Sequence, residues 1–178
     1  MRSVLSAALL LALAGCGAGE TGAAATPAAE PAADAAPAAP ANVARFASEA
    51  GELEVTTVAE GLEHPWGLTF LPDGRYLVTE RPGRLRIVAA DGTLSAPVAG
   101  VPEVFAKGQG GLLDVALDPD FATTPWVYLS FSEPGEGGGG TSVARGRWEN
   151  DALVDVEVIF SQSPKLDTGQ HFGSRLVF

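Results

Sequence analysis

A glycine-rich loop runs into an apolar segment at Lys107-Gly108-Gln109-Gly110-Gly111-Leu112-Leu113-Asp114-Val115-Ala116-Leu117. The three glycines let the backbone take positive φ angles or approach a ligand closely, and the branched apolar residues that follow are typical of a β-strand. Asp118-Pro119-Asp120 then predicts a turn, and residues 126–131 form a second β-rich run. We therefore predict a β-hairpin that presents one amide side chain, Gln109, at the mouth of its first strand.

Segments with a similar organisation lie on both sides of this hairpin. Short β-rich runs separated by turn signals at residues 55–59, 66–71, 75–80 and 84–88 predict a four-stranded antiparallel meander. Gly67 and Gly111 open comparable units 44 residues apart, which fits the period of roughly 40–50 residues of one four-stranded propeller blade. Residues 173–178 predict a third such start, cut off within a strand. Because two to three blades cannot close a ring, we expect an all-β N-terminal fragment of a longer propeller.

The amino terminus carries export signals. A positive start at Met1-Arg2 precedes an apolar run over residues 4–14 and the small-residue sequence Leu13-Ala14-Gly15-Cys16. Residues 1–16 are thus similar to a bacterial lipoprotein signal peptide with its lipobox, in which Cys16 is lipidated after cleavage. The alternative is a secreted protein cleaved nearby, with Cys16 as a free thiol. We expect a protein of the cell envelope that is lipid-anchored and faces the periplasm, or else a secreted protein. Gly17 follows the cysteine in place of the aspartate that would favour retention at the inner membrane, so we expect the outer membrane.

Residues 17–52 predict a disordered tether. Their first part, residues 17–41, consists largely of alanine interrupted by four prolines and offers no aromatic or branched apolar side chain to bury. The folded part then covers residues 53–178. Cys16 is the only cysteine, so no internal disulfide can form, and the formal net charge of −11 argues against a nucleic-acid partner.

Five groups of residues together carry a resemblance to a known family. They are Pro65-Trp66-Gly67-Leu68 with Leu71-Pro72-Asp73-Gly74, residues 79–85, residues 108–114, residues 118–121 and His171-Phe172-Gly173-Ser174-Arg175-Leu176. In this order they resemble the glucose/sorbosone dehydrogenase family, in its aldose sugar dehydrogenase branch. The resemblance implies a six-bladed β-propeller, of which this chain holds the first two to three blades. It also implies an exported oxidoreductase that uses pyrroloquinoline quinone (PQQ) and calcium to oxidise an aldose hydroxyl, with hydride transfer to the quinone and a further electron acceptor.

The resemblance assigns roles to two residues. His171 matches the general base that removes the proton from the sugar hydroxyl, and a histidine that titrates near pH ~6.5 is largely neutral in the periplasm. Gln109 matches the amide beside the quinone oxygens, where it can donate a hydrogen bond without adding charge. The family's basic residues that neutralise the cofactor's carboxylates and its calcium ligands are expected beyond Phe178, so we expect the chain alone to be inactive.

Other candidates have simpler interpretations. We expect His64 to be a surface loop residue, Trp66 and Trp126 to pack within blades, and Arg175 to anchor its strand. An Asp-Pro-Asp turn usually caps itself, so Asp114, Asp118 and Asp120 are not assigned to a metal. The alternative function is a non-catalytic, lipid-tethered propeller that binds a saccharide or an envelope protein.

Overall fold

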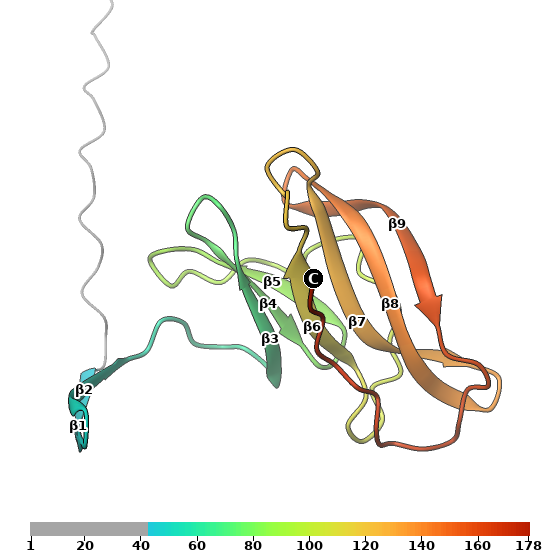
Figure 1. Cartoon of the computed structure of the whole chain (residues 1–178), viewed down its shortest axis with the longest axis horizontal. Helices are drawn as coiled ribbons and strands as arrows, with labels where there is room; N and C mark the ends of the chain where they lie inside the picture. The colour runs from blue at the N-terminus through green and yellow to red at the C-terminus, as the bar shows by residue number, and fades with distance from the viewer. Residues whose placement is uncertain (1–42) are drawn as a thin grey trace, which may run out of the picture. The chain divides into compact units, whose positions relative to one another are not determined.

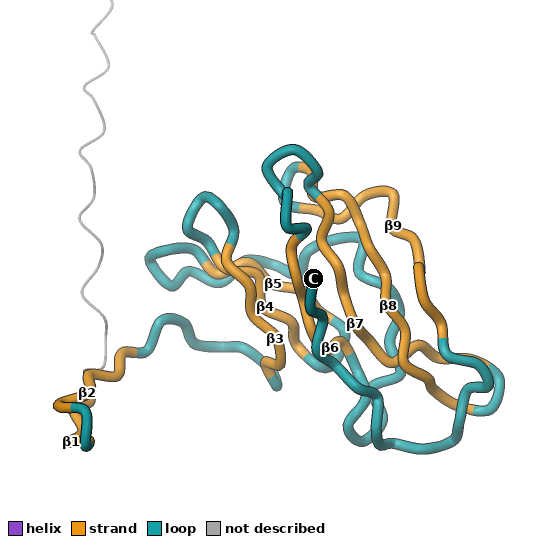
Figure 2. Tube along the Cα trace, in the orientation of Figure 1, coloured by secondary structure: helices purple, strands orange, loops and turns teal. Residues whose placement is uncertain are grey.

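The computed structural model describes residues 43–178, and the predictions for residues 1–42, including the signal peptide and Cys16, lie outside the described residues. All regular structure in the described part is β, as predicted (Figures 1 and 2). No helix long and apolar enough to cross a membrane occurs between residues 43 and 178. The strands form three antiparallel sheets with the orders β1-β2, β3-β4-β5 and β6-β7-β8-β9.

The first sheet is an isolated hairpin of β1 (Val43–Ser48) and β2 (Gly51–Thr56), with Phe46 opposite Leu53. Two predictions are wrong here. The tether was expected to reach residue 52, but strand structure begins at Val43, and the first meander strand was expected at residues 55–59, but β2 ends at Thr56. The alanine- and proline-rich composition ends before Val43, and the aromatic and branched residues beyond it pair across the hairpin.

The second sheet contains β3 (Pro65–Phe70), β4 (Tyr76–Glu80) and β5 (Arg84–Val88). These three strands confirm three of the four predicted for the meander. The strand predicted at residues 55–59 does not join this sheet, and beyond β5 a single bridge pairs Val88 with Leu94. The turn between β3 and β4 is closed by the amide of Gly74, which donates to the carbonyl of Leu71 at 3.0 Å.

The third sheet has the four strands expected of a complete blade. It contains β6 (Leu112–Leu117), β7 (Trp126–Gly135), β8 (Gly138–Glu149) and β9 (Ala152–Ser161). The pairing of β6 with β7 confirms the hairpin predicted from the glycine-rich loop and the Asp-Pro-Asp turn. Two successive antiparallel meanders are the arrangement of neighbouring propeller blades.

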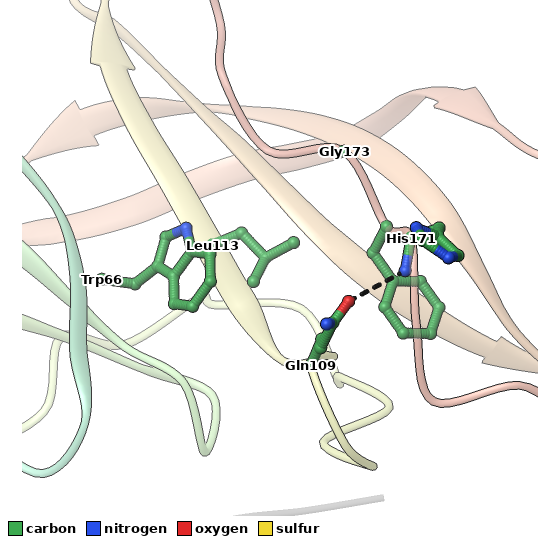
Figure 3. Close-up of a pocket in the computed structure, with 6 residues that line it drawn as sticks. Trp66, Gln109, Leu113, His171 and Gly173 are labelled. Carbon is green, nitrogen blue, oxygen red and sulfur yellow. Dashed lines mark hydrogen bonds between the residues drawn. The ribbon is translucent and has the colours of Figure 1, made fainter.

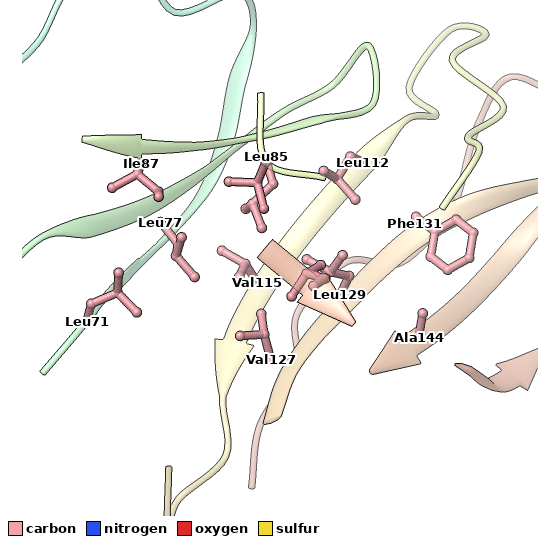
Figure 4. Packing of buried hydrophobic residues seen from close by; sticks show 12 residues of the cluster. Leu71, Leu77, Leu85, Ile87, Leu112, Val115, Val127, Leu129, Phe131 and Ala144 are labelled. Carbon is pink, nitrogen blue, oxygen red and sulfur yellow. The ribbon is translucent and has the colours of Figure 1, made fainter. Parts of the chain in front are cut away.

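A continuous hydrophobic core joins the second and third sheets (Figure 4). β3 and β4 both contact β6. Leu77 and Leu85 from one sheet and Val127, Leu129 and Phe131 from the other are all at most 1% exposed. The alternation of apolar residues along β7 thus points into this core, as the period of two predicts.

β3 and β6 share one irregularity, a β-bulge near the start of each strand. In β3, Trp66 and Gly67 together face Thr79, and in β6, Leu113 and Asp114 together face Ser130. In both bulges the hydroxyl of the opposite residue accepts the amide N–H of the second bulged residue, at 2.8 Å from Gly67 to Thr79 and 2.9 Å from Asp114 to Ser130.

The same hydroxyls connect each sheet to the next segment. Thr79 Oγ1 donates to the carbonyl of Leu113, and Ser130 Oγ donates to the carbonyl of Ser174, each at 2.5 Å. By this geometry Trp66, Leu113 and Ser174 are equivalent positions. The repeat from Trp66 to Leu113 is therefore 47 residues, not the 44 counted from Gly67 to Gly111, because the two glycines occupy different places around the bulge.

The predicted third strand start, residues 173–178, takes the equivalent position but is not a strand. Its backbone is bound by side chains instead of a neighbouring strand. The amide of Leu176 donates to Asp114 Oδ2 at 2.7 Å, and the ring of Phe178 packs edge-on against Tyr128 with centroids 5.0 Å apart. The prediction of a strand is wrong for these residues, while the prediction of a third repeat agrees with the hydroxyl contact at Ser174.

Candidate active site

A pocket of about 430 Å³ lies where the loop before β6 meets the loop after β9. Its lining combines two polar side chains, Gln109 and His171, with the surfaces of Trp66, Leu113 and Phe172 and the backbone of Gly173 (Figure 3). The sequence predicted that Gln109 and His171 stand at two strand mouths, which is confirmed for Gln109 before β6 and wrong for His171, because no strand follows it. The structure brings these two residues, 62 positions apart, to one pocket.

The loop that carries Gln109 is held by backbone contacts. Gly108 has a φ of 62° and Gly111 a φ of 139°, values that favour glycine. A Cβ at Gly111 would lie 2.0 Å from the carbonyl oxygen of Arg81, and a Cβ at Gly108 would lie 2.4 Å from that of Gly169. The positive φ angles were predicted for this loop, whereas the close neighbours of these two glycines are other backbone segments of the protein.

The loop that carries His171 is bound directly to Gln109. The amide of Gln109 donates to the carbonyl of Gly169 at 2.7 Å, and the side-chain Oε1 of Gln109 accepts the amide N–H of His171 at 3.1 Å (Figure 3). His171 takes a left-handed backbone conformation with φ 64°, which histidine tolerates better than most residues. The second of these hydrogen bonds orients the side-chain amide of Gln109, with its oxygen toward the backbone of His171.

The polar atoms that remain in the pocket follow from this arrangement. With Oε1 facing the amide of His171, the Nε2 of Gln109 is left as a donor, and it makes no hydrogen bond within residues 43–178. The ring nitrogens of exposed His171 also have no hydrogen-bonding partner in that range. The pocket therefore offers one oriented N–H donor and one imidazole above an apolar floor of Leu113 and Phe172.

The segment after His171 is fixed by a buried carboxylate. Asp114 is 1% exposed and accepts hydrogen bonds from the amide of Leu176 at 2.7 Å and from the guanidinium of Arg175 at 3.0 Å. Arg175 thus anchors its own segment, as predicted. Asp114 received no role from the sequence, although its place between apolar strand residues is a signal that its carboxylate needs partners when buried.

Trp66 differs from its prediction. The sequence favoured packing within a blade, yet the side chain is 49% exposed, lines the pocket, and donates from Nε1 to Ser174 Oγ at 2.8 Å. The bulge in β3 explains the difference, because Trp66 stands outside the strict alternation that predicts which side chains are buried. Trp126 is half-buried, and the guanidinium of Arg145 lies 4.7 Å from its ring centre.

The remaining candidates agree with their simpler interpretations. His64 is an exposed loop residue. Asp118 Oδ1 accepts the amide N–H of Asp120 at 2.9 Å, so the turn caps itself. Within residues 43–178, no three His, Cys, Asp or Glu side chains gather in a way that could hold a metal ion.

Comparison with known proteins places these residues in context. The family model for glucose/sorbosone dehydrogenase matches residues 62–178. The aldose sugar dehydrogenase YliI of Escherichia coli is 51% identical over 130 residues, which cover 71% of this chain and 35% of that protein. The crystal structure of the soluble aldose sugar dehydrogenase of E. coli in its apo-form has a TM-score of 0.65 at 51% identity, over 68% of this chain and 36% of that one.

A third similar protein is solved with a cofactor. The PQQ-bound form of aldose sugar dehydrogenase from Streptomyces coelicolor has a TM-score of 0.55 at 31% identity, over 71% of this chain and 37% of that chain. The chain thus spans about a third of the length of the relatives it matches.

Proposed function

The chain belongs to the glucose/sorbosone dehydrogenase family, and we propose that it forms the part of a PQQ-dependent aldose sugar dehydrogenase that supplies Gln109 and His171 to the active site. The observation that carries this proposal is the direct contact between the two, with Gln109 Oε1 accepting the amide N–H of His171 at 3.1 Å in one pocket. The family match supports the substrate class, a small sugar.

The residues of the pocket fit PQQ. Its volume of about 430 Å³ lies within the ~300–1,000 Å³ usual for small-molecule sites. A flat aromatic cofactor suits an apolar floor, and its quinone oxygens suit the oriented N–H donor of Gln109 Nε2. The PQQ-bound relative supports the same cofactor. When bound, PQQ supplies the electron-pair acceptor for a hydride from the sugar carbon.

His171 is proposed as the general base. Its exposed imidazole would accept the hydroxyl proton of the sugar at Nε2, the ring nitrogen farther from the backbone. Gln109 would contribute twice, because its Oε1 holds the backbone of His171 while its Nε2 faces the cofactor. A neutral amide does so without placing a charge beside the quinone.

Calcium and the electron acceptor enter this proposal through the family resemblance alone. Asp114 is engaged by Arg175 and Leu176, and Asp118 caps its own turn, so both carboxylates already have structural roles. Export and a lipid anchor at Cys16 are likewise proposals, supported by the order of charge, apolar run and small residues at the amino terminus.

The proposal is tested with the protein expressed from its complete gene, supplied with PQQ, Ca²⁺, an aldose and a dye as electron acceptor. We expect dye reduction, and we expect His171→Ala to lower its rate by about 10²–10⁴-fold because a general base contributes that much. His64→Ala is the matched control, since His64 is the only other histidine and lies in an exposed loop. A His171→Ala variant with the wild-type rate would remove His171 from the mechanism. The absence of any turnover with loaded cofactor would favour the non-catalytic binding module.

A further inference from the structure

The turn between β7 and β8 is rich in glycine, and these glycines make room for another segment. A Cβ at Gly135 would lie 2.9 Å from Lys165 Cγ, and a Cβ at Gly140 would lie 2.8 Å from Lys165 Cδ. A Cβ at Gly138 would lie 2.3 Å from the carbonyl oxygen of Leu166. Gly135, Gly138 and Gly140 therefore form a surface, the lysine seat, against which the aliphatic stem of Lys165 and the backbone of Leu166 pack.

The ammonium group of Lys165 is fully engaged at the end of this seat. Its side chain is 12% exposed, and Nζ lies 2.5 Å from Glu133 Oε2, 3.0 Å from Ser161 Oγ and 3.3 Å from Ser142 Oγ. These three partners match the three N–H donors of an ammonium group. The ion pair with Lys165, together with hydrogen bonds from Ser161 and Ser142, lowers the pKa of Glu133 to about 2.

A continuous set of contacts runs from this seat to the pocket. Leu166 exchanges both backbone hydrogen bonds with Gly139, at 2.9 and 3.0 Å. Three residues later the carbonyl of Gly169 accepts the amide of Gln109, and two residues after that the amide of His171 donates to Gln109 Oε1. Lys165 precedes His171 by only six positions, so a displaced Lys165 is expected to shift the loop that presents the imidazole.

We propose that Lys165 is a positioning residue for His171: seated among Gly135 and Gly140 and held by Glu133, Ser142 and Ser161, it fixes the loop that places the imidazole beside Gln109. The inference rests on the proposed function. It concerns how the base is held, and Lys165 itself does not line the pocket that contains Gln109 and His171. The glycines of the β7–β8 turn acquire a purpose in this view that the sequence did not suggest.

The decisive experiment is a double-mutant cycle in the protein from its complete gene, loaded with PQQ and Ca²⁺. We expect Lys165→Met to lower kcat by about 10–100-fold, since misplacing a reacting group by about 1 Å can cost that much, with KM and PQQ affinity changed less than about twofold. In the His171→Ala background the same substitution should change kcat by less than about twofold, because Lys165 acts through His171. A general structural role would lower both rates equally, and that result would overturn the proposal.

A second readout needs no catalysis. In the cofactor-free protein, hydrogen exchange at the amides of His171 and Gln109 should quicken at least about tenfold in Lys165→Met. Arg145→Met is the control, because it removes an ion pair of the same sheet, with Glu157 at 2.5 Å, that is more exposed than the Lys165 pair and lies away from the His171 loop. Unchanged exchange in Lys165→Met, or equal change in both variants, would contradict the proposal.

Two further variants keep the test open if Lys165→Met does not fold. Gly140→Ala displaces the lysine stem without altering any charge, and Ser142→Ala removes one partner of the ammonium group. Both should raise the hydrogen-exchange rate of the His171 amide above that of the wild type. Wild-type exchange rates in both variants would contradict the proposal. A wild-type rate in His171→Ala would remove His171 from the proposed mechanism and the positioning role with it, whereas a silent Lys165→Met beside an inactive His171→Ala would end only the positioning role.

Discussion

The two loops that meet at the pocket are held in place by different means. The Gln109 loop is held chiefly by close backbone approach, because its glycines lie against the carbonyls of Arg81 and Phe105 at distances that no Cβ permits. Neutral Ser132 and the Arg81 guanidinium add hydrogen bonds to Gly111 and Gly108. The His171 loop is held by side chains on both flanks, Lys165 with Glu133 before it and Asp114 after it. A loop fixed by backbone contact tolerates no added atom, while a loop fixed by side chains depends on charge.

The largest expected effect tests the backbone-held loop. Gly111→Ala should lower the free energy of unfolding by about 2–5 kcal/mol, because a left-handed conformation strains alanine by about 1–2 kcal/mol and the forced contact with Arg81 adds about 1–3 kcal/mol. Gly74→Ala is the control, since Gly74 also has positive φ, at 87°, but nothing lies within 4 Å of its Cβ position. Denaturant unfolding measures both, and equal losses would show that contact with Arg81 does not matter.

A smaller loss is expected from the segment after His171. Asp114→Ala should cost about 1.5–3 kcal/mol of unfolding free energy, the range for a hydrogen bond to a charged group, because the amide of Leu176 loses its acceptor. Arg175→Met should cost no more than about 1 kcal/mol, since that side chain is 73% exposed and buried Asp114 keeps the amide of Leu176 as a donor. If the two substitutions cost the same, the ion pair and not the backbone contact holds the segment.

The segment before His171 should respond to acid. The pKa of Glu133 is lowered from 4.5 to about 2 by Lys165, Ser161 and Ser142, so the ionised carboxylate stabilises the folded state. This stabilisation is complete above about pH 4.5 and is lost as the pH falls toward 2, and we expect it to amount to about 1–2 kcal/mol. In Glu133→Gln the unfolding free energy should therefore fall less steeply over that range than in the wild type. Parallel curves for the two proteins would exclude this role.

The smallest effect is expected where the two loops exchange charges. Lys107 Nζ lies 2.6 Å from Asp167 Oδ1, but the side chains are 55% and 79% exposed. Lys107→Met should change the unfolding free energy by less than about 1 kcal/mol, as is usual for exposed ion pairs. The difference in unfolding free energy between the wild type and Lys107→Met should appear only at low salt. A larger loss that persists at high salt would mean that charges also hold the Gln109 loop.

The difference between the loops also explains what the sequence could predict. The hairpin of β6 and β7 and the positive φ angles near Gln109 follow from local signals, namely glycines, alternation and a turn of known chemistry. That Gln109 and His171 belong to one active site was implied by the family resemblance, and no local signal predicted their direct contact. The partners of Lys165 and Asp114 could not be foreseen, because Glu133 and Leu176 lie 32 and 62 residues away and nothing local points to them.

Two errors have the same physical origin. Trp66 was expected to pack within a blade, but it lies in a bulge of β3 and its side chain is 49% exposed. Residues 173–178 were assigned to a strand because of their composition, yet side chains of the third sheet bind their backbone. Strand composition shows that a segment is extended but does not show which groups satisfy its hydrogen bonds.

The bulges at Trp66 and Leu113 also bear on how such a pocket can diversify. The first residue of each bulge lines the pocket, while the hydroxyls of Thr79 and Ser130 secure the backbone beside it. The two sheets have the same hydrogen bonds at the bulge, although the first bulged residue is a tryptophan in one and a leucine in the other. Because of the extra residue, the side chain that lines the pocket can differ without a change in the pairing of the strands. Successive repeats can therefore acquire different binding surfaces by single substitutions, without redesign of the fold.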